Sequence, residues 1–130
     1  MAYCLMRSHY HLIVAVDENV LPAAMHALNH PYARFHNRRY ALRGHVQFRR
    51  YGSRRIEGDE DLLNTYAYVA NNPVEAGLCT SPADWPWSSY AGTIGLCDLP
   101  TFVEPALVLG CFDWPAIDPH VALRARVEKT

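Results

Sequence analysis

The first sixteen positions, which read MAYCLMRSHYHLIVAV, form an apolar run with polar residues only at 7–9 and 11. We predict one strand over residues 2–16, in which successive side chains point to opposite faces. In that strand Tyr10 lies on one face, whereas His9 and His11 lie together on the other. The polar residues 17–19 follow as the turn that ends the strand.

A helical repeat follows this apolar run after residue 20. Pro22 suits the first turn of a helix. The apolar positions then recur at three- and four-residue steps, at Met25, Leu28, Tyr32 and Phe35. Pro31 lies inside this helix, and we expect it to kink the helix or to split it in two. Residues 43–57, RGHVQFRRYGSRRIE, then predict a loop and a short, edge-like pair of strands.

A second helix is predicted from Gly58 to about Asn72. The acidic residues 59–61 favour its positive N-terminal end, and Pro73 is expected to end it. Its apolar face, which we expect in the core, consists of Leu62, Tyr66, Val69 and Ala70. A different, polar side carries three residues at four-residue steps, namely Asn64, Tyr68 and Asn72.

The C-terminal part of the chain is less regular. The segment SPADWPWSSY predicts a packed, irregular stretch, and two short helices follow it, the last capped by Asp118 before Pro119. The 130 residues suffice for one domain with a real core, and no apolar run is long enough to span a membrane. Four cysteines fall in no metal-binding spacing, so we expect reduced thiols in a cytoplasmic protein: Cys4, Cys79, Cys97 and Cys111.

Basic residues are concentrated in one stretch, although the net charge is only −1. No Asp or Glu lies between Asn19 and Ile56, yet this stretch holds eight of the twelve basic residues. All eight are arginine, whose planar fork suits phosphate. The pattern favours binding of a phosphate backbone over a merely solvated surface. These candidate contacts are Arg34, Arg38, Arg39, Arg43, Arg49, Arg50, Arg54 and Arg55.

Two further features carry candidate chemistry, and each has an ordinary alternative. His9 and His11 suit a divalent metal, but a pair of surface histidines needs none. Tyr68 lies on the polar helix side and could act as a nucleophile, or could be a half-exposed tyrosine. A phenol becomes a useful nucleophile where a cation stabilises its phenolate. A phosphodiester held over two imidazoles, a metal and Tyr68 would unite all these features.

Four blocks of the sequence carry a resemblance. They read YCLMRSHYHLIV, NRRYALRGHVQFRRYGSR, DEDLLNTYAYVANNPVEAGL and WPWSSY, and they extend from about Tyr3 to Gly95. In this order they resemble the single-tyrosine HUH transposases, in particular the REP-associated tyrosine transposases and their insertion-sequence relatives. HUH denotes two histidines around a hydrophobic residue, here His9, Tyr10 and His11.

The resemblance implies a fold and an activity. The fold would be α+β, a ferredoxin-like antiparallel sheet with helices on one face, over residues 1–95, followed by a helical tail over 96–130. The activity would be cleavage of single-stranded DNA beside a hairpin, through a 5′-phosphotyrosine link to Tyr68. The metal, Mg²⁺ or Mn²⁺, would be held by His9, His11 and Asn72. We also expect a small homodimer, although the REP-associated branch can act as a monomer.

The chain departs from the family in three ways, one of which is Pro31, at a position where relatives continue a helix. Arg7 and Ser8 replace the Pro-Asn that normally precedes the first of the paired histidines. Relatives also carry a strand and a helix before YCLM, so we expect an N-terminally truncated domain with an unpaired sheet edge. The alternative to a transposase is therefore a non-catalytic remnant that grips hairpin or single-stranded DNA. A third possibility is a product of a decayed gene without DNA activity.

Overall fold

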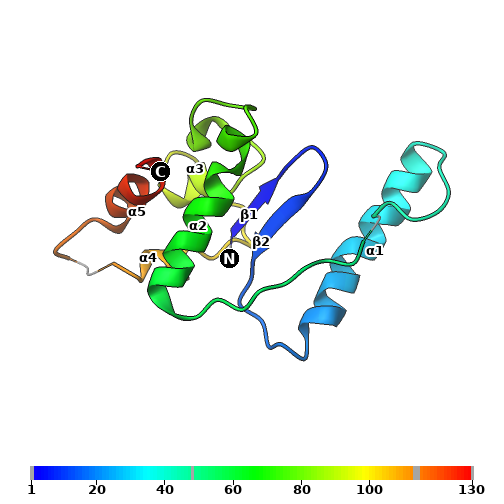
Figure 1. Ribbon diagram of the computed structural model, residues 1–130, viewed down its shortest axis with the longest axis horizontal. Helices are drawn as coiled ribbons and strands as arrows, with labels where there is room; N and C mark the ends of the chain where they lie inside the picture. The colour runs from blue at the N-terminus through cyan, green and yellow to red at the C-terminus, as the bar shows by residue number, and fades with distance from the viewer. Residues whose placement is uncertain (1, 48, 113–114, 130) are drawn as a thin grey trace. The chain divides into compact units, whose positions relative to one another are not determined.

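The computed structural model describes residues 2–47, 49–112 and 115–129, and these form an α+β structure (Figure 1). The chain divides into two compact units. The first contains Met1–Val14 and Ile56–Thr130, and the second contains Ala15–Arg55. The predicted α+β class is confirmed, whereas the ferredoxin-like topology and the division into residues 1–95 and 96–130 stay predictions.

The sheet of the first unit is a hairpin. Strand β1, Ala2–Leu5, pairs antiparallel with β2, Tyr10–Ile13, with Cys4 opposite His11. The expected single strand over residues 2–16 is therefore wrong. The chain reverses at residues 6–9, where the Met6 N–H donates to the His9 carbonyl at 2.8 Å. This reversal places His11 on the same sheet face as Cys4, whereas one continuous strand would have put them on opposite faces.

The segment after η1, Pro82–Asp84, lies along the other edge of β1. The Leu5 N–H donates to the Trp87 carbonyl at 2.8 Å, and the Ser89 N–H donates to the Tyr3 carbonyl at 3.0 Å. An isolated bridge joins Cys4 to Ser88 between them. The predicted irregular segment thus satisfies backbone groups that this edge would otherwise leave to water.

Helix α1, Leu21–Arg39, belongs to the second unit and continues past Pro31. Of the two expected outcomes, splitting of the helix at Pro31 is wrong, and a kink there stays a prediction. A proline in a helix removes one hydrogen bond to the residue four positions earlier, here Ala27. Because Ala27 is exposed, water can satisfy its carbonyl. Of the predicted apolar positions only Met25 is buried; the exposed ones are Leu28, Tyr32 and Phe35.

Helix α1 is followed by an extended loop. None of the described residues between 41 and 57 forms a strand, so the predicted strand pair is wrong. Like charges placed opposite each other destabilise a two-stranded pair, and such a pair also needs an apolar face to bury. The arginines at 49–50 and 54–55 would bring like charges together, and they are exposed and so bury no apolar face.

Helix α2, Gly58–Glu75, runs through the first unit. Its acidic first turn is as predicted, and Asp61 accepts a hydrogen bond from the Glu57 N–H at 2.9 Å. The helix does not end at Asn72 but passes through Pro73 for two more residues. Pro73 is buried in the last turn, where the loss of one backbone hydrogen bond is tolerated and the ring is packed.

The core lies between α2, the sheet and the C-terminal helices, which are α3, Tyr90–Thr93, α4, Ala106–Leu109, and α5, Pro119–Glu128. The two predicted C-terminal helices are confirmed, and Asp118 caps α5 by accepting from the His120 N–H at 2.9 Å. The core residues are Ala2, Leu63, Tyr66, Ala67, Ala70, Tyr90, Ile94, Val108, Leu123 and Val127. Among the described helices, none has the length and apolar character that a bilayer crossing requires.

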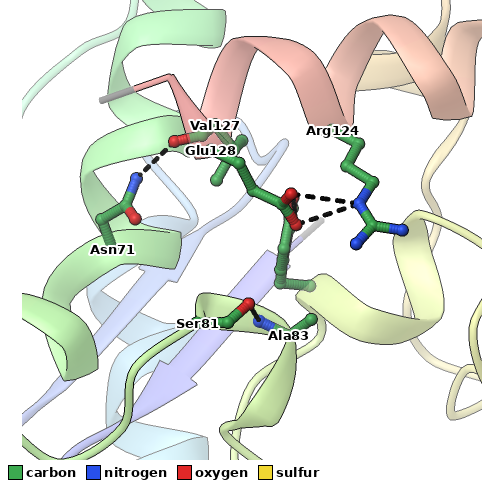
Figure 2. A network of polar contacts seen from close by, with 7 residues as sticks. Asn71, Ser81, Ala83, Arg124, Val127 and Glu128 are labelled. Carbon is green, nitrogen blue, oxygen red and sulfur yellow. Dashed lines mark hydrogen bonds and ion pairs between the residues drawn. The ribbon is translucent and has the colours of Figure 1, made fainter.

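One buried amide ties α2 to α5 (Figure 2). The side-chain nitrogen of Asn71 donates to the Val127 carbonyl at 2.9 Å and to the Ala67 carbonyl at 3.1 Å. Arg124 and Glu128 form an ion pair on α5 beside it, with N–O distances of 3.1 Å. Because Asn71 precedes Asn72, this anchor fixes the helical turn that carries the candidate site.

Candidate active site

Asn72 on α2 connects the helix to strand β2. Its Oδ1 lies 3.2 Å from Nε2 of His11, and its Nδ2 donates to the Tyr68 carbonyl at 2.9 Å. A carbonyl oxygen can only accept, so the NH₂ group must face Tyr68 and the amide oxygen must face His11. Two residues that are 61 positions apart are thus joined by an interaction with a fixed orientation.

The rings of His9, His11 and Tyr68 lie next to one another. The centroids of the His9 and His11 rings are 5.0 Å apart, and those of His11 and Tyr68 are 5.7 Å apart. Both pairs meet edge to face, with interplanar angles of 90° and 79°. Tyr68 is 54% exposed, which leaves its phenol accessible to a large substrate. All three residues and Asn72 belong to the first compact unit.

The environment of His11 favours its neutral form. Partial burial lowers the pKa of its imidazole below 6.5, and the neighbouring His9 lowers it further. The hydrogen bond to Asn72 raises the pKa but does not offset these effects. A neutral imidazole is the form that binds a metal ion.

The neighbouring tyrosine of α2 is unsuited to nucleophilic attack. Tyr66 is only 3% exposed and packs in the core, as predicted. Burial raises the pKa of its phenol to about 12, and contacts with Thr93 and Ser89 offset this only in part. Of the two tyrosines of this helix, Tyr68 is therefore the candidate nucleophile.

The donor set fits a hard divalent cation. Two imidazole nitrogens and one amide oxygen suit Mn²⁺ or Mg²⁺ when water completes the shell. The 3.2 Å between Nε2 of His11 and Oδ1 of Asn72 approaches the ~3.0 Å edge of an octahedron whose ligand bonds are about 2.1 Å long. Within the described part of the chain, no cluster of three or more His, Cys, Asp or Glu offers another metal site.

The predicted DNA contacts lie in the second unit. All eight arginines are exposed, in α1 and in the loop that follows it. Arg34 and Arg38 continue a line of four-residue steps from His26 and His30, so the four share one side of α1. The rings of His26 and His30 are stacked, with centroids 5.1 Å apart. The structure thus gathers His9, His11 and Tyr68 in the first unit, and the eight arginines in the second.

Sequence reasoning missed two residues beside the site. Ser8 lies 3.2 Å from Nδ1 of His9 through its hydroxyl oxygen, a contact suggested only by its adjacency to that histidine. Asn71 anchors the turn that holds Asn72, as described above. A polar residue among the buried positions of α2 was the signal for it, since Ala67 and Ala70 lie on the same side of the helix.

Comparison with known proteins gives one relative. The chain is 30% identical over 107 residues to a protein of Haemophilus influenzae (strain ATCC 51907 / DSM 11121 / KW20 / Rd) named "Putative REP-associated tyrosine transposase". The alignment covers 69% of this chain and 57% of that relative, so the chain spans little more than half of the relative's length. No family model and no solved structure matches the chain. This similarity supports the family resemblance given by the four sequence blocks.

Proposed function

We propose that this chain acts on single-stranded DNA as a REP-associated tyrosine transposase does, by forming a covalent link between Tyr68 and a 5′ phosphate. One observation carries the proposal: Asn72 hydrogen-bonds both the Tyr68 backbone and the His11 ring. It therefore holds the candidate nucleophile and the paired histidines together. The similarity to the Haemophilus protein supports a transposase-related function.

Each residue has a distinct role in this proposal. His9, His11 and Asn72 would hold the divalent cation through two ring nitrogens and one amide oxygen. When bound, the cation withdraws charge from the scissile phosphate and stabilises a phenolate. Tyr68 supplies the nucleophilic oxygen from the exposed side of α2. The buried anchor at Asn71 keeps this turn of the helix in register with α5.

The covalent step is a transesterification. The bond between Oη of Tyr68 and phosphorus forms as the bond between phosphorus and the 3′ oxygen breaks. The phenol proton is lost to solvent, and the departing 3′ oxygen gains a proton and leaves as a hydroxyl. Attack of a 3′ hydroxyl on the phosphotyrosine reverses the exchange and joins strands. No oxidant or nucleotide is consumed, because one phosphoester replaces another.

The arginines of the second unit would bind the DNA backbone. The predicted contacts are all exposed, and the stretch between Asn19 and Ile56 contains no acidic residue to neutralise them. Contacts with phosphate release counterions, so binding should weaken steeply as salt rises. The arginines would thus bind phosphates along the strand, whereas His9, His11 and Asn72 would hold the cation at the reacting phosphate.

A covalent-adduct assay tests the cleavage. A 3′-labelled hairpin strand with a single-stranded flank is incubated with the protein and Mn²⁺, then separated under denaturing conditions. The wild type should shift the label to the mass of the protein, and Tyr68→Phe should not. Tyr32→Phe is the matched control, because Tyr32 is 55% exposed and this substitution likewise removes only a hydroxyl. A Tyr68→Phe protein that still forms the adduct would exclude Tyr68 as the nucleophile.

A second candidate is a binding module that does not cleave. It is favoured by the separation of the arginines, in residues 15–55, from the unit that carries Tyr68. Such a module would bind the labelled hairpin in a salt-sensitive manner and form no adduct at any Mn²⁺ concentration. Binding without an adduct by the wild-type chain would support this alternative over the transposase.

A further inference from the structure

Three aromatic side chains follow one another at four-residue steps along α1 and the residue that ends it: Tyr32, His36 and Tyr40. The ring centroids of Tyr32 and His36 are 6.0 Å apart, and those of His36 and Tyr40 are 4.8 Å apart. We call these three residues the aromatic row. His36 is half-buried, whereas Tyr32 is 55% exposed and Tyr40 is 62% exposed. The aromatic row therefore has an accessible phenol ring at each end.

Packing within the second unit does not explain this aromatic surface. The structure describes all of α1, and Met25 is the only buried residue of the helix. Phe35 lies three positions after Tyr32, beside the aromatic row, and is 63% exposed. Large apolar groups gathered on one exposed face commonly mark a binding site. A partner of this face should therefore offer flat, apolar groups to the rings.

The loop after α1 returns along the helix and borders the aromatic row. The side chain of Asn37 donates to the Gly44 carbonyl at 2.8 Å, and the side chain of Gln47 donates to Oδ1 of Asn29 at 2.9 Å. Asn29 lies seven positions before His36, so the two share one side of the helix. Residues 44–47 are thus held against the side of α1 that carries the middle of the row.

Basic residues surround the aromatic row, and acidic residues do not. Arg39 is exposed and lies three positions after His36, so the two are neighbours on the helix. Arg43 precedes the loop segment that borders the row, and Arg49 follows it; both are exposed. No Asp or Glu lies between positions 19 and 56. Exposed aromatic rings beside arginines complement unpaired nucleotides, whose bases stack on such rings while their phosphates meet the positive charge.

We propose that the aromatic row is a stacking platform for the unpaired bases of single-stranded DNA. This inference rests on the proposed function for the identity of the nucleic acid. Tyr32 and Tyr40 are eight residues apart, which is about 12 Å along the helix axis. At about 3.4 Å per nucleotide, three or four stacked nucleotides cover that length. Arg34 and Arg38 lie two positions after Tyr32 and His36, on another side of α1, so their phosphate contacts are separable from base stacking.

Two labelled strands of equal length separate stacking from phosphate binding: oligothymidine, and an abasic strand that keeps the phosphates but lacks the bases. Fluorescence anisotropy in EDTA measures both affinities, and the wild type should bind oligothymidine more tightly. Tyr32→Leu and Tyr40→Leu each remove one exposed ring. Each should weaken oligothymidine binding by about 5- to 150-fold and leave abasic binding unchanged. Tyr40→Phe keeps the ring and should bind as the wild type does. Phe102→Leu is the control, because Phe102 is 64% exposed and belongs to the first unit.

Three results of this assay would overturn the proposal. They are equal wild-type affinities for the two strands, leucine variants that bind oligothymidine as the wild type does, and leucine variants that lose affinity for both strands alike. Sedimentation velocity without DNA tests a second copy of this chain as the occupant. A wild-type dimer that Tyr32→Leu converts to a monomer would assign the aromatic row to self-association instead. Neither a metal nor Tyr68 takes part, so failure here is distinguishable from failure of the covalent-adduct assay.

Discussion

The amide of Asn72 bonds the backbone of Tyr68 with its nitrogen and faces the ring of His11 with its oxygen, 3.2 Å from Nε2. One side chain thereby fixes the distance between the helix that carries the phenol and the strand that carries the imidazole. The nitrogen-side bond returns to the carbonyl four residues earlier, a contact that anchors the side chain to its own helix. Asn72 is therefore both a candidate ligand and the residue that orients the other candidates.

Replacing Asn72 separates these two roles. Asn72→Ala removes the amide oxygen, and we expect Mn²⁺ affinity to fall by about 10-fold or more. Asn72→Asp keeps an oxygen ligand and adds negative charge, so its Mn²⁺ affinity should match or exceed that of the wild type. Isothermal titration calorimetry with Mn²⁺ measures both. Equal affinities for wild type and Asn72→Ala would remove Asn72 from the metal site.

The lowered pKa of His11 predicts a direction for the pH dependence of stability. The unfolded state binds a proton at His11 near pH 6.5, and the folded state does so only at lower pH. The free energy of unfolding should therefore fall as pH drops below 6.5. This fall should level off once pH passes below the pKa of His11 in the folded state, because the ring is then protonated in both states. Urea unfolding between pH 5 and 8 tests this, with His11→Gln as the variant in which the slope decreases.

A second substitution tests the causes of that shift. His9→Gln removes the neighbouring charge and should raise the pKa of His11. The pKa should stay below 6.5, because burial is the larger cause. An NMR pH titration of the His11 ring gives both values directly. A His11 pKa that does not rise in His9→Gln would show that the two rings do not interact as the structure indicates.

Regular periodicity explains what could be predicted. The apolar and polar sides of α2 follow from helical spacing, which is why Tyr66 and Tyr68 could be separated before their burial was known. The hairpin was missed because the apolar run resumes on both sides of the turn, and MRSH contains neither glycine nor asparagine to mark a reversal. Pro73 was misjudged because its cost depends on its place in the last turn and on the packing of its ring.

Contacts between distant segments could not be derived in the same way. The bond between His11 and Asn72 depends on how β2 lies against α2, which no local pattern encodes. The same holds for the bridge between Cys4 and Ser88. Five expectations stay predictions: the metal, the DNA partner, the homodimer, the cytoplasmic location and the truncated N-terminus. The tests above address the metal and the DNA partner.

Asn71 offers a test of the scaffold behind the site. Its amide nitrogen bonds the Val127 and Ala67 carbonyls in a buried position. Asn71→Ala leaves both carbonyls without this donor, and we expect the free energy of unfolding to fall by about 1–3 kcal/mol. Asn71→Asp should cost more, because it turns an oxygen or a buried charge toward two carbonyls. Asn19→Ala, at an exposed asparagine, is the control and should change stability by less than about 0.5 kcal/mol. Thermal unfolding measures all three.

The arginines of α1 predict a change in salt dependence that is independent of cleavage. Arg34 and Arg38 share one side of the helix, so the double variant Arg34→Gln/Arg38→Gln removes two adjacent phosphate contacts. Each contact with single-stranded DNA contributes about 0.7 to the slope of log affinity against log salt, so the slope should decrease by about 1.4. Arg124→Gln is the control, since Arg124 pairs with Glu128 and should leave the slope unchanged. Fluorescence anisotropy of a labelled hairpin strand, measured from low to moderate salt, gives these slopes. An unchanged slope in the double variant would place the DNA backbone elsewhere on the protein.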